Sequence, residues 1–448
     1  MLKPSSKRSE RAVPSSRSSR MMGMGALAGR LAQNVITEGS RQLLKGQKPR
    51  MSDLLLTKEN VGRVTDQLAR MRGAAMKVGQ LVSMDAGNLL PRELADILAR
   101  LQDDAIRMPA TQWSAILEKS WGADWQEQFS RFSFDPIAAA SIGQVHEATD
   151  RSGRHMAIKI QYPGVAKSID SDVANVVSLL KMSGLVPKSL DLEPLIIEAR
   201  AQLHLEADYR HEGQQMRDYA SAVLSMDQAD SFLLPEWFDE LSTEQILCMS
   251  FLKGAPLASI PPGSLEASRV MSELFRLFFA ELLCFGRVQT DPNLANFSYQ
   301  SDTGKIILLD FGAVRTYAAG FVKNYQAALE AATANANDSV MLGDALQILG
   351  FFQDNINATN RSAVIDIFLM AAEPLRTSGL YDFGTSDLAS RIQQRGMSIS
   401  SDPQAWHTPP PDVLFLHRKM AGLYLMAARL AAKVDVSHIF KEAVQRRP

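Results

Sequence analysis

Residues 289–312 read QTDPNLANFSYQSDTGKIILLDFG, and this stretch decides which fold the chain is expected to adopt. It opens on a loop that contains Asp291 and, five residues later, Asn296. A short apolar run, IILL, follows and delivers Asp310, the first residue of an Asp-Phe-Gly tripeptide. The pattern predicts a polar loop, then a buried strand, with a second carboxylate where the strand ends.

Carboxylate and amide groups at this spacing suit phosphoryl transfer. That reaction needs metal ions to neutralise phosphate charge and a carboxylate to orient the attacking oxygen, with little covalent help from the protein. An Asp with an Asn five residues on, and Asp-Phe-Gly beyond a strand, is the spacing that kinases use. The tripeptide alone is a weak signal, but the combination indicates a nucleotide site.

Upstream, Lys159 in MAIKI lies in a predicted strand between small and apolar residues. Such a lysine can meet the α- and β-phosphates of a nucleotide, although alone it is more simply a surface residue. A kinase holds this lysine with an acid on a helix. Glu206 in LEADYRHEG is the candidate, and Glu198 and Glu212 compete with it. Asp208 is two residues from Glu206, so the two acids should have different partners.

The position expected for a glycine-rich phosphate loop is rich in alanine instead. It reads Ala138-Ala139-Ala140-Ser141-Ile142-Gly143-Gln144. Glycine amides can approach phosphates closely, whereas alanine methyl groups crowd the backbone and restrict φ. We expect this Ala-rich loop to bind nucleotide in a different pose or with altered nucleotide preference.

The order of patterns predicts an α+β, two-lobed, protein-kinase-like fold with a helical extension in front. A disordered basic tail (1–20) precedes helices (21–110), a β-rich lobe with a helical insertion (111–252) and a helical lobe (253–448). Strands are expected in SIGQVHEAT and MAIKIQY, joined by a hairpin at Ser152-Gly153, and in FLLPEWF and QILCMSFL. From about residue 264 onward, KIILLDFG is the one β segment expected in a helical pattern.

Composition excludes several classes of protein. The 448 residues carry a net charge of −1, and the basic tail leaves the remainder mildly acidic, so a nucleic-acid partner is not expected. Cys248 and Cys284 sit in apolar surroundings without zinc spacing and should be reduced thiols. No apolar segment reaches the roughly 20 residues that a membrane span needs. For residues 21–48, close helix packing and contact with an anionic membrane both stay open. The Ser- and Arg-rich start of the chain also leaves a mitochondrial transit peptide open.

Several segments together resemble the UbiB/AarF (ADCK) family of atypical kinases, from about residue 65 to residue 440. They are AAASIGQV, MAIKIQYPGV, LEADYRHE, QTDPNLANF and LLDFGAVR, with KVGQ at 77–80 matching the KxGQ signature of that family. The stretch FLHRKMAGLYL, with His417 and Arg418, resembles its C-terminal region. The reading QTDPN, rather than HADPH, favours the mitochondrial coenzyme-Q branch.

The resemblance implies a kinase-like fold that binds Mg–ATP, has ATPase activity linked to lipids, and supports ubiquinone biosynthesis. By position, the implied roles are an ion pair between Lys159 and Glu206, a catalytic-loop carboxylate at Asp291, and Mg²⁺ ligands at Asn296 and Asp310. Further implied roles are nucleotide contacts at Ala138, Ala139, Ala140, Ser141, Lys159 and Met249, and a regulatory set of Lys77, Gly79, Gln80 and Asp208. Because the resemblance places Lys77 in the cleft, a buried Lys77 would need an acid partner, and Glu206 and Asp208 are the candidates.

Two positions depart from the family pattern: Met249-Ser250 replaces a Met-Glu pair at the hinge, and Leu294-Ala295 replaces a Trp-Ser. The first puts a side-chain contact to the nucleotide in doubt. A nucleotide-binding pseudokinase scaffold and an ordinary kinase are the alternatives, and the Ala-rich loop argues against the ordinary kinase. The implied partners are ATP, anionic membrane lipid and quinone-biosynthesis proteins, and a homodimer stays open. The implied compartment is the bacterial cytoplasm or the mitochondrial matrix.

Overall fold

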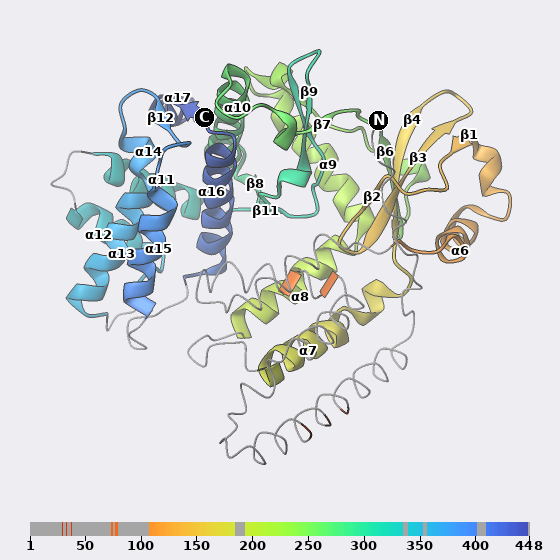
Figure 1. The fold of residues 1–448 in the computed structure, drawn as a ribbon, viewed down its shortest axis with the longest axis horizontal. Coiled ribbons are helices and arrows are strands. Elements are labelled where there is room, and N and C mark those ends of the chain that lie inside the picture. The colour runs from red at the N-terminus through yellow and green to blue at the C-terminus, as the bar shows by residue number, and fades with distance from the viewer. Residues whose placement is uncertain are drawn as a thin grey trace. The chain divides into compact units, whose positions relative to one another are not determined.

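The computed structural model describes residues 29, 33, 37, 73–74, 77–78, 107–183, 193–334, 339–352, 356–400 and 409–446. The expected basic tail, most of the expected front helices, and Gly79 and Gln80 therefore lie outside the described residues. The chain divides into two compact units, one formed by residues 1–213 and 237–251 and the other by residues 214–236 and 252–448. Figure 1 labels the helices and strands of both units.

The first unit contains an antiparallel sheet with strand order β1-β3-β4-β6, to which β2 adds by pairing with β3. The strands are β1 (Phe129–Phe132), β2 (Ala138–Ala139), β3 (Gly143–Asp150), β4 (His155–Gln161) and β6 (Ile246–Ser250). Between β3 and β4 the chain turns at Gly153, whose φ of 89° suits glycine, and Asp150 accepts hydrogen bonds from Ser152 N and Arg154 N. The predicted hairpin is confirmed.

The core of this sheet is built from apolar residues that alternate along β4, from Ala148 of β3 and from α6 (Ala110–Trp121). Trp113 of α6 packs against Trp125, with ring centroids 6.2 Å apart, and against Phe132. The cluster comprises Met108, Trp113, Ile116, Leu117, Trp125, Phe129, Ala148, Met156, Ile158, Ile160, Tyr162, Phe238, Ile246 and Cys248. This packing fixes the strand that carries Lys159.

Three helices follow the hairpin: α7 (Val165–Ser183), α8 (Glu193–Glu206) and α9 (Tyr209–Leu224). The helical insertion expected within residues 111–252 is interrupted just after Glu206. Asp208 caps the new helix by accepting a hydrogen bond from His211 N at 3.0 Å. Helix α9 begins in the first unit and ends in the second.

The second unit is mainly helical, with α10 (Leu265–Ala280), the π-helical turn η6 (Glu281–Phe285), α11 (Ala319–Thr333), α12 (Ser339–Ile348), α13 (Ala358–Ala371), α14 (Glu373–Arg376), α15 (Leu388–Ser400), α16 (Pro411–Arg429) and α17 (Val436–Gln445). The expectation of a single β segment after residue 264 was wrong. The strands are β8 (Arg287–Gln289), β9 (Phe297–Gln300), β10 (Lys305–Leu308), β11 (Val314–Thr316), β12 (Tyr381–Asp382) and β13 (Lys433–Val434). Most of them are too short to show an alternating pattern.

The strands around the Asp-Phe-Gly segment form two small sheets. In one, β10 pairs in parallel with β5 (Phe232–Leu233) and antiparallel with β9, which also pairs with β7 (Ala255–Pro256). In the other, β8 pairs with β11. Of the strand expected over FLLPEWF, only Phe232 and Leu233 pair in this way, and Pro235 cannot donate to a ladder.

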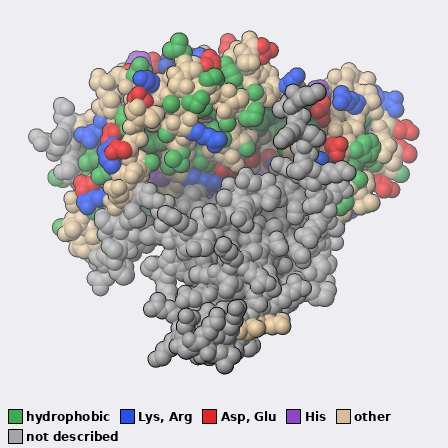
Figure 2. Space-filling view, in the orientation of Figure 1, with side chains coloured by type: hydrophobic (Ala, Val, Ile, Leu, Met, Phe, Trp, Pro, Cys, Tyr) green, Lys and Arg blue, Asp and Glu red, His purple; other side chains and the backbone are tan. Residues whose placement is uncertain are grey.

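The described surface carries charges of both signs, and Figure 2 shows basic and acidic side chains interspersed on one face. Both cysteines are free thiols, and Cys248 is buried. Within the ranges that the structure describes, no helix is both long and apolar enough to cross a membrane.

His417, on α16, lies among the aromatic rings of Tyr325, Phe351 and Phe368, and its Nε2 has no hydrogen-bond partner. Burial lowers the pKa of His417 from 6.5 to about 4. Because the folded-state pKa lies below the ordinary value, the unfolded chain takes up this proton first as the pH falls. The stability that the neutral ring contributes is therefore complete above pH 6.5 and lost between pH 6.5 and pH 4.

We expect acidification across this window to cost about 1.4 kcal/mol of unfolding free energy per pH unit through His417. Urea unfolding at two pH values on either side of 6.5 measures the loss, and His417→Phe should show a correspondingly smaller one. The control is His204→Gln, an exposed histidine on α8, which should keep the wild-type dependence. Equal acid sensitivity of wild type and His417→Phe would contradict this account.

Candidate active site

In the first unit, Lys159 is held by a buried carboxylate. Its Nζ donates to both carboxylate oxygens of Glu212, at 2.8 and 2.9 Å, and Glu212 is only 3% exposed. In the sheet, Lys159 lies between Val145 of β3 and Leu247 of β6, so its backbone is fixed on both sides. Nζ also lies 5.0 Å from the centroid of the Tyr209 ring. The ammonium group is thereby oriented before any ligand binds.

The predicted ion pair between Lys159 and Glu206 was wrong, and Glu212, the competing carboxylate, takes that place. The reason is the helix boundary: Glu206 is the last residue of α8, whereas Glu212 lies in the first turn of α9. The cap at Asp208 starts a new helix, and Glu212 reaches the lysine from it.

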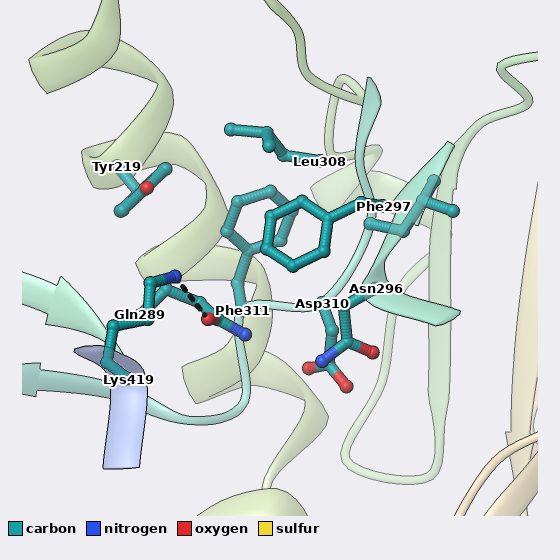
Figure 3. Close-up of a pocket in the computed structure, with 9 residues that line it drawn as sticks. Tyr219, Gln289, Asn296, Phe297, Leu308, Asp310, Phe311 and Lys419 are labelled. Carbon is teal, nitrogen blue, oxygen red and sulfur yellow. Dashed lines mark hydrogen bonds between the residues drawn. The ribbon is translucent and has the colours of Figure 1, made fainter. Parts of the chain in front are cut away.

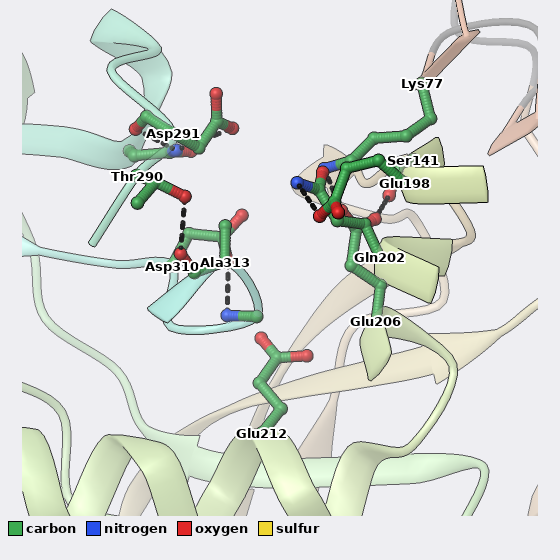
Figure 4. Close-up of polar contacts among 12 residues, drawn as sticks. Lys77, Ser141, Glu198, Gln202, Glu206, Glu212, Thr290, Asp291, Asp310 and Ala313 are labelled. Carbon is green, nitrogen blue, oxygen red and sulfur yellow. Dashed lines mark hydrogen bonds and ion pairs between the residues drawn. The ribbon is translucent and has the colours of Figure 1, made fainter. Parts of the chain in front are cut away.

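Glu206 has a different cationic partner, Lys77 of the KxGQ segment. Lys77 is 3% exposed, and Ser141 Oγ donates to the second carboxylate oxygen of Glu206 at 2.9 Å (Figure 4). The sequence analysis expected Glu206 and Asp208 to have different partners, and this is confirmed, since Asp208 caps α9. Glu206 therefore ties the front extension to the Ala-rich loop.

The Ala-rich loop is a tight β-hairpin. Ala138 and Ala139 form β2, and Ala140 N donates to Gly143 O at 2.8 Å, closing the turn. Ala138 and Ala139 are exposed and Ala140 is half-buried, whereas Ile142 at the tip is buried. The front extension covers this tip: a Cβ on Gly73 would lie only 2.6 Å from Ile142 Cγ2. Met249, the expected hinge residue, lies in β6 with Ala157 of β4 opposite it.

The pairing of Lys159 predicts which acid matters most for nucleotide affinity. Glu212→Gln should weaken Mg–ATP binding by about 10- to 100-fold, because a charge-assisted hydrogen bond to the lysine is lost and Nζ is no longer fixed. Isothermal titration measures the effect. Glu198→Gln on α8 is the matched control and should bind like wild type. A weaker affinity in the Glu206→Gln variant, with wild-type affinity in Glu212→Gln, would reverse the assignment.

In the second unit, the loop after β8 is pinned at three points. Thr290 donates from both N and Oγ1 to Ala313 O, at 3.0 and 2.9 Å. Asp291 accepts from Arg418 Nη2 at 2.8 Å and from Asn296 Nδ2 at 3.1 Å. Arg418 is 7% exposed, and α16, which carries it, runs beside β8 and β11 (Figure 1). The Asp291 carboxylate is therefore held in a fixed position.

Asn296 and Asp310 are brought together by the backbone. Leu309 N donates to Asn296 O at 3.0 Å, and Gly312 N donates to Asp310 Oδ1 at 2.9 Å. Figure 3 shows the Asn296 amide and the Asp310 carboxylate side by side. Because Asn296 Nδ2 donates to Asp291, its carbonyl oxygen is the end that can accept a cation.

This donor set fits Mg²⁺, which prefers hard oxygen ligands and is usually held by one or two side chains together with substrate phosphates. In the part of the chain that the structure describes, no group of three or more His, Cys, Asp or Glu side chains could hold a metal. An ion held by Asn296 and Asp310 would therefore take its other ligands from phosphate oxygens and water.

The two cations of α16 that contact this loop were not among the expected site residues. Arg418 was noted only for its family resemblance, and Lys419, which donates to Gln289 Oε1 at 3.1 Å, was not singled out. Both are buried. The available signal was the pair of adjacent cations inside the otherwise apolar stretch FLHRKMAGLYL, because a charge on an apolar face needs a partner.

The chain is similar to known proteins along most of its length. The family profile described as "ABC1 atypical kinase-like domain" matches residues 100–342. The chain is 37% identical over 434 residues to "Atypical kinase COQ8, mitochondrial" of Saccharomyces cerevisiae, covering 96% of this chain and 85% of that protein. It is 36% identical over 440 residues to "Atypical kinase COQ8B, mitochondrial" of Rattus norvegicus, covering 98% and 82%.

A solved structure is also similar. The complex of Rv3197 with erythromycin from Mycobacterium tuberculosis matches with a TM-score of 0.59 at 24% sequence identity, covering 86% of this chain and 96% of that one. At this identity the likeness bears on the fold alone.

Proposed function

Because the chain belongs to the ABC1 atypical kinase family, we propose that it binds Mg–ATP and uses it in a phosphoryl-transfer or ATP-hydrolysis reaction that supports ubiquinone biosynthesis. The observation that carries the proposal is the set of polar groups that this chemistry needs. The first unit supplies the oriented Lys159, and the second supplies Asp291, Asn296 and Asp310.

Each group has a role that follows from its contacts. Lys159, held by Glu212, neutralises the α- and β-phosphates. Asn296 and Asp310 hold Mg²⁺, which when bound offsets the negative charge of the phosphates. Asp291 orients the attacking hydroxyl or water, and its hydrogen bond from Arg418 keeps the carboxylate in one rotamer. These roles require positioning and charge rather than covalent chemistry.

The remaining parts shape the site. Ala138, Ala139, Ala140 and Ser141 form the loop that covers the nucleotide, and the backbone at Met249 contacts its base. The buried pair of Lys77 and Glu206, with Gly79, Gln80 and Asp208, forms a regulatory element that restricts which substrates enter. We propose a lipid, a small molecule or a partner protein near a membrane as the substrate. Since the two relatives described above are named mitochondrial, we propose the mitochondrial matrix as the compartment.

ATP hydrolysis by the purified full chain tests the proposal. We expect release of phosphate that depends on Mg²⁺, is abolished by EDTA, and rises with anionic liposomes. Binding of Mg–ATP without any hydrolysis or transfer would instead support a pseudokinase scaffold. Quinone profiling of a strain that lacks the chain tests the pathway, and unchanged ubiquinone in that strain would refute a role in its biosynthesis.

A further inference from the structure

A buried pair of opposite charges lies beside Gln289, two residues before Asp291. Glu281, 0% exposed, opens the π-helical turn η6, and Lys419, 2% exposed, lies on α16. The Lys419 Nζ and Glu281 Oε2 atoms are 3.8 Å apart. Burial raises the pKa of Glu281 and lowers that of Lys419, so each charge depends on the other. An apolar pair of similar volume would often stabilise a core as well or better.

The other contacts of Glu281 lead to the loop. Its Oε1 accepts from Gln289 N at 2.9 Å and from Tyr219 OH at 2.6 Å. Gln289 is the last residue of β8 and precedes Asp291 by two positions. The carboxylate therefore fixes the backbone at the point where the strand becomes the loop. A π-helical turn is uncommon and is found mostly at functional sites.

Lys419 holds the side chain of the same residue. Its Nζ donates to Gln289 Oε1 at 3.1 Å and lies 5.4 Å from the centroid of the Phe297 ring, just past the loop (Figure 3). Its neighbour on α16, Arg418, pairs with Asp291 itself. Gln289 is thus held by its backbone from η6 and by its side chain from α16.

We propose that Glu281 and Lys419 are positioning residues for the reaction: by clamping Gln289 they hold Asp291 in register with Asn296 and Asp310. The inference rests on the proposed function. It differs from a purely structural role because both charged groups hydrogen-bond to Gln289, the strand residue from which the loop with Asp291 begins. Neither Glu281 nor Lys419 is among the residues proposed to contact Mg–ATP. Loss of either charged group should therefore affect turnover more than nucleotide binding.

The test compares ATP hydrolysis, Mg–ATP affinity and melting temperature of wild type with Lys419→Met, Glu281→Gln and the double variant. Each single variant should lower kcat by about 30-fold or more through a displaced carboxylate, with affinity within about twofold of wild type. Lys419→Met should also melt several degrees lower, because it leaves a buried carboxylate unpaired. The double variant has no charge at either position of this pair, so no buried charge is left without its partner there. Its melting temperature should therefore recover while its kcat stays low.

The control is Lys433→Met, which removes an exposed lysine of the same unit that pairs with Asp382 and should leave kcat unchanged. Recovery of kcat together with melting temperature in the double variant would overturn the inference, because the pair would then serve stability alone. Wild-type kcat in both single variants would overturn it as well. Absence of both ATP hydrolysis and phosphoryl transfer in the wild type would overturn the proposed function and, with it, this inference.

Discussion

Asp310→Asn should abolish Mg²⁺-dependent ATP binding and lower ATP hydrolysis by at least about 10³-fold. The substitution keeps the shape of the side chain, and its amide oxygen can still accept the hydrogen bond that Gly312 N gives to Oδ1. The change is therefore one of charge at a position where an anionic oxygen balances the ion. Asn296, the other proposed Mg²⁺ ligand, is neutral and cannot replace the negative charge that Asp310→Asn removes.

Thermal shift and isothermal titration with Mg–ATP measure this effect. The matched control is Asp302→Asn, an isosteric change at an exposed turn between β9 and β10, which should respond like wild type. A normal ATP-induced rise in melting temperature for Asp310→Asn would remove Asp310 from the metal site. The folded state of the variant itself should melt near the wild-type temperature, since its local hydrogen bond is preserved.

The fold class could be predicted because its signals are local. The hairpin of β3 and β4 is encoded by alternating apolar residues and a Ser-Gly turn, and β10 by the run IILL before Asp310. The α+β, kinase-like fold expected from these signals is confirmed by the mixed helices and sheets of the structure and by the match to the ABC1 atypical kinase-like domain. The short strands β8, β11, β12 and β13 were missed, because two or three residues carry no periodicity and pair only through tertiary contacts.

The pairing of charges could be predicted only in part. An acid partner for Lys77 was expected among Glu206 and Asp208, and Glu206 is confirmed. The predicted partner of Lys159 was wrong because the boundary between α8 and α9 decides which acid reaches the lysine. The spacing of apolar residues does not reveal a helix boundary that is set by a capping residue. Sequence spacing sets which residues share a face, but not which faces meet.

The contacts of α16 lay beyond any local pattern. Arg418 is 127 positions from Asp291 in the chain, and Lys419 is 130 from Gln289. Only packing of α16 against the loop brings them together, and that packing depends on a residue without a side chain. A Cβ on Gly422 would lie 2.1 Å from Pro292 Cβ and 2.4 Å from Pro292 Cγ. The helix therefore approaches the loop as closely as a glycine allows.

Gly422→Ala should accordingly lower ATP hydrolysis by about 100-fold, because the new methyl group must push Pro292, and with it the adjacent Asp291, out of place. Overpacking of this kind should also cost about 1–3 kcal/mol of unfolding free energy. The matched control is Gly396→Ala on α15, where a Cβ meets nothing within 4 Å. There the same methyl group should stabilise the helix by about 0.5–1 kcal/mol and leave hydrolysis unchanged. Wild-type turnover in Gly422→Ala would mean that Pro292 can shift without moving the Asp291 carboxylate. Contact with α16 would then not set the position of Asp291.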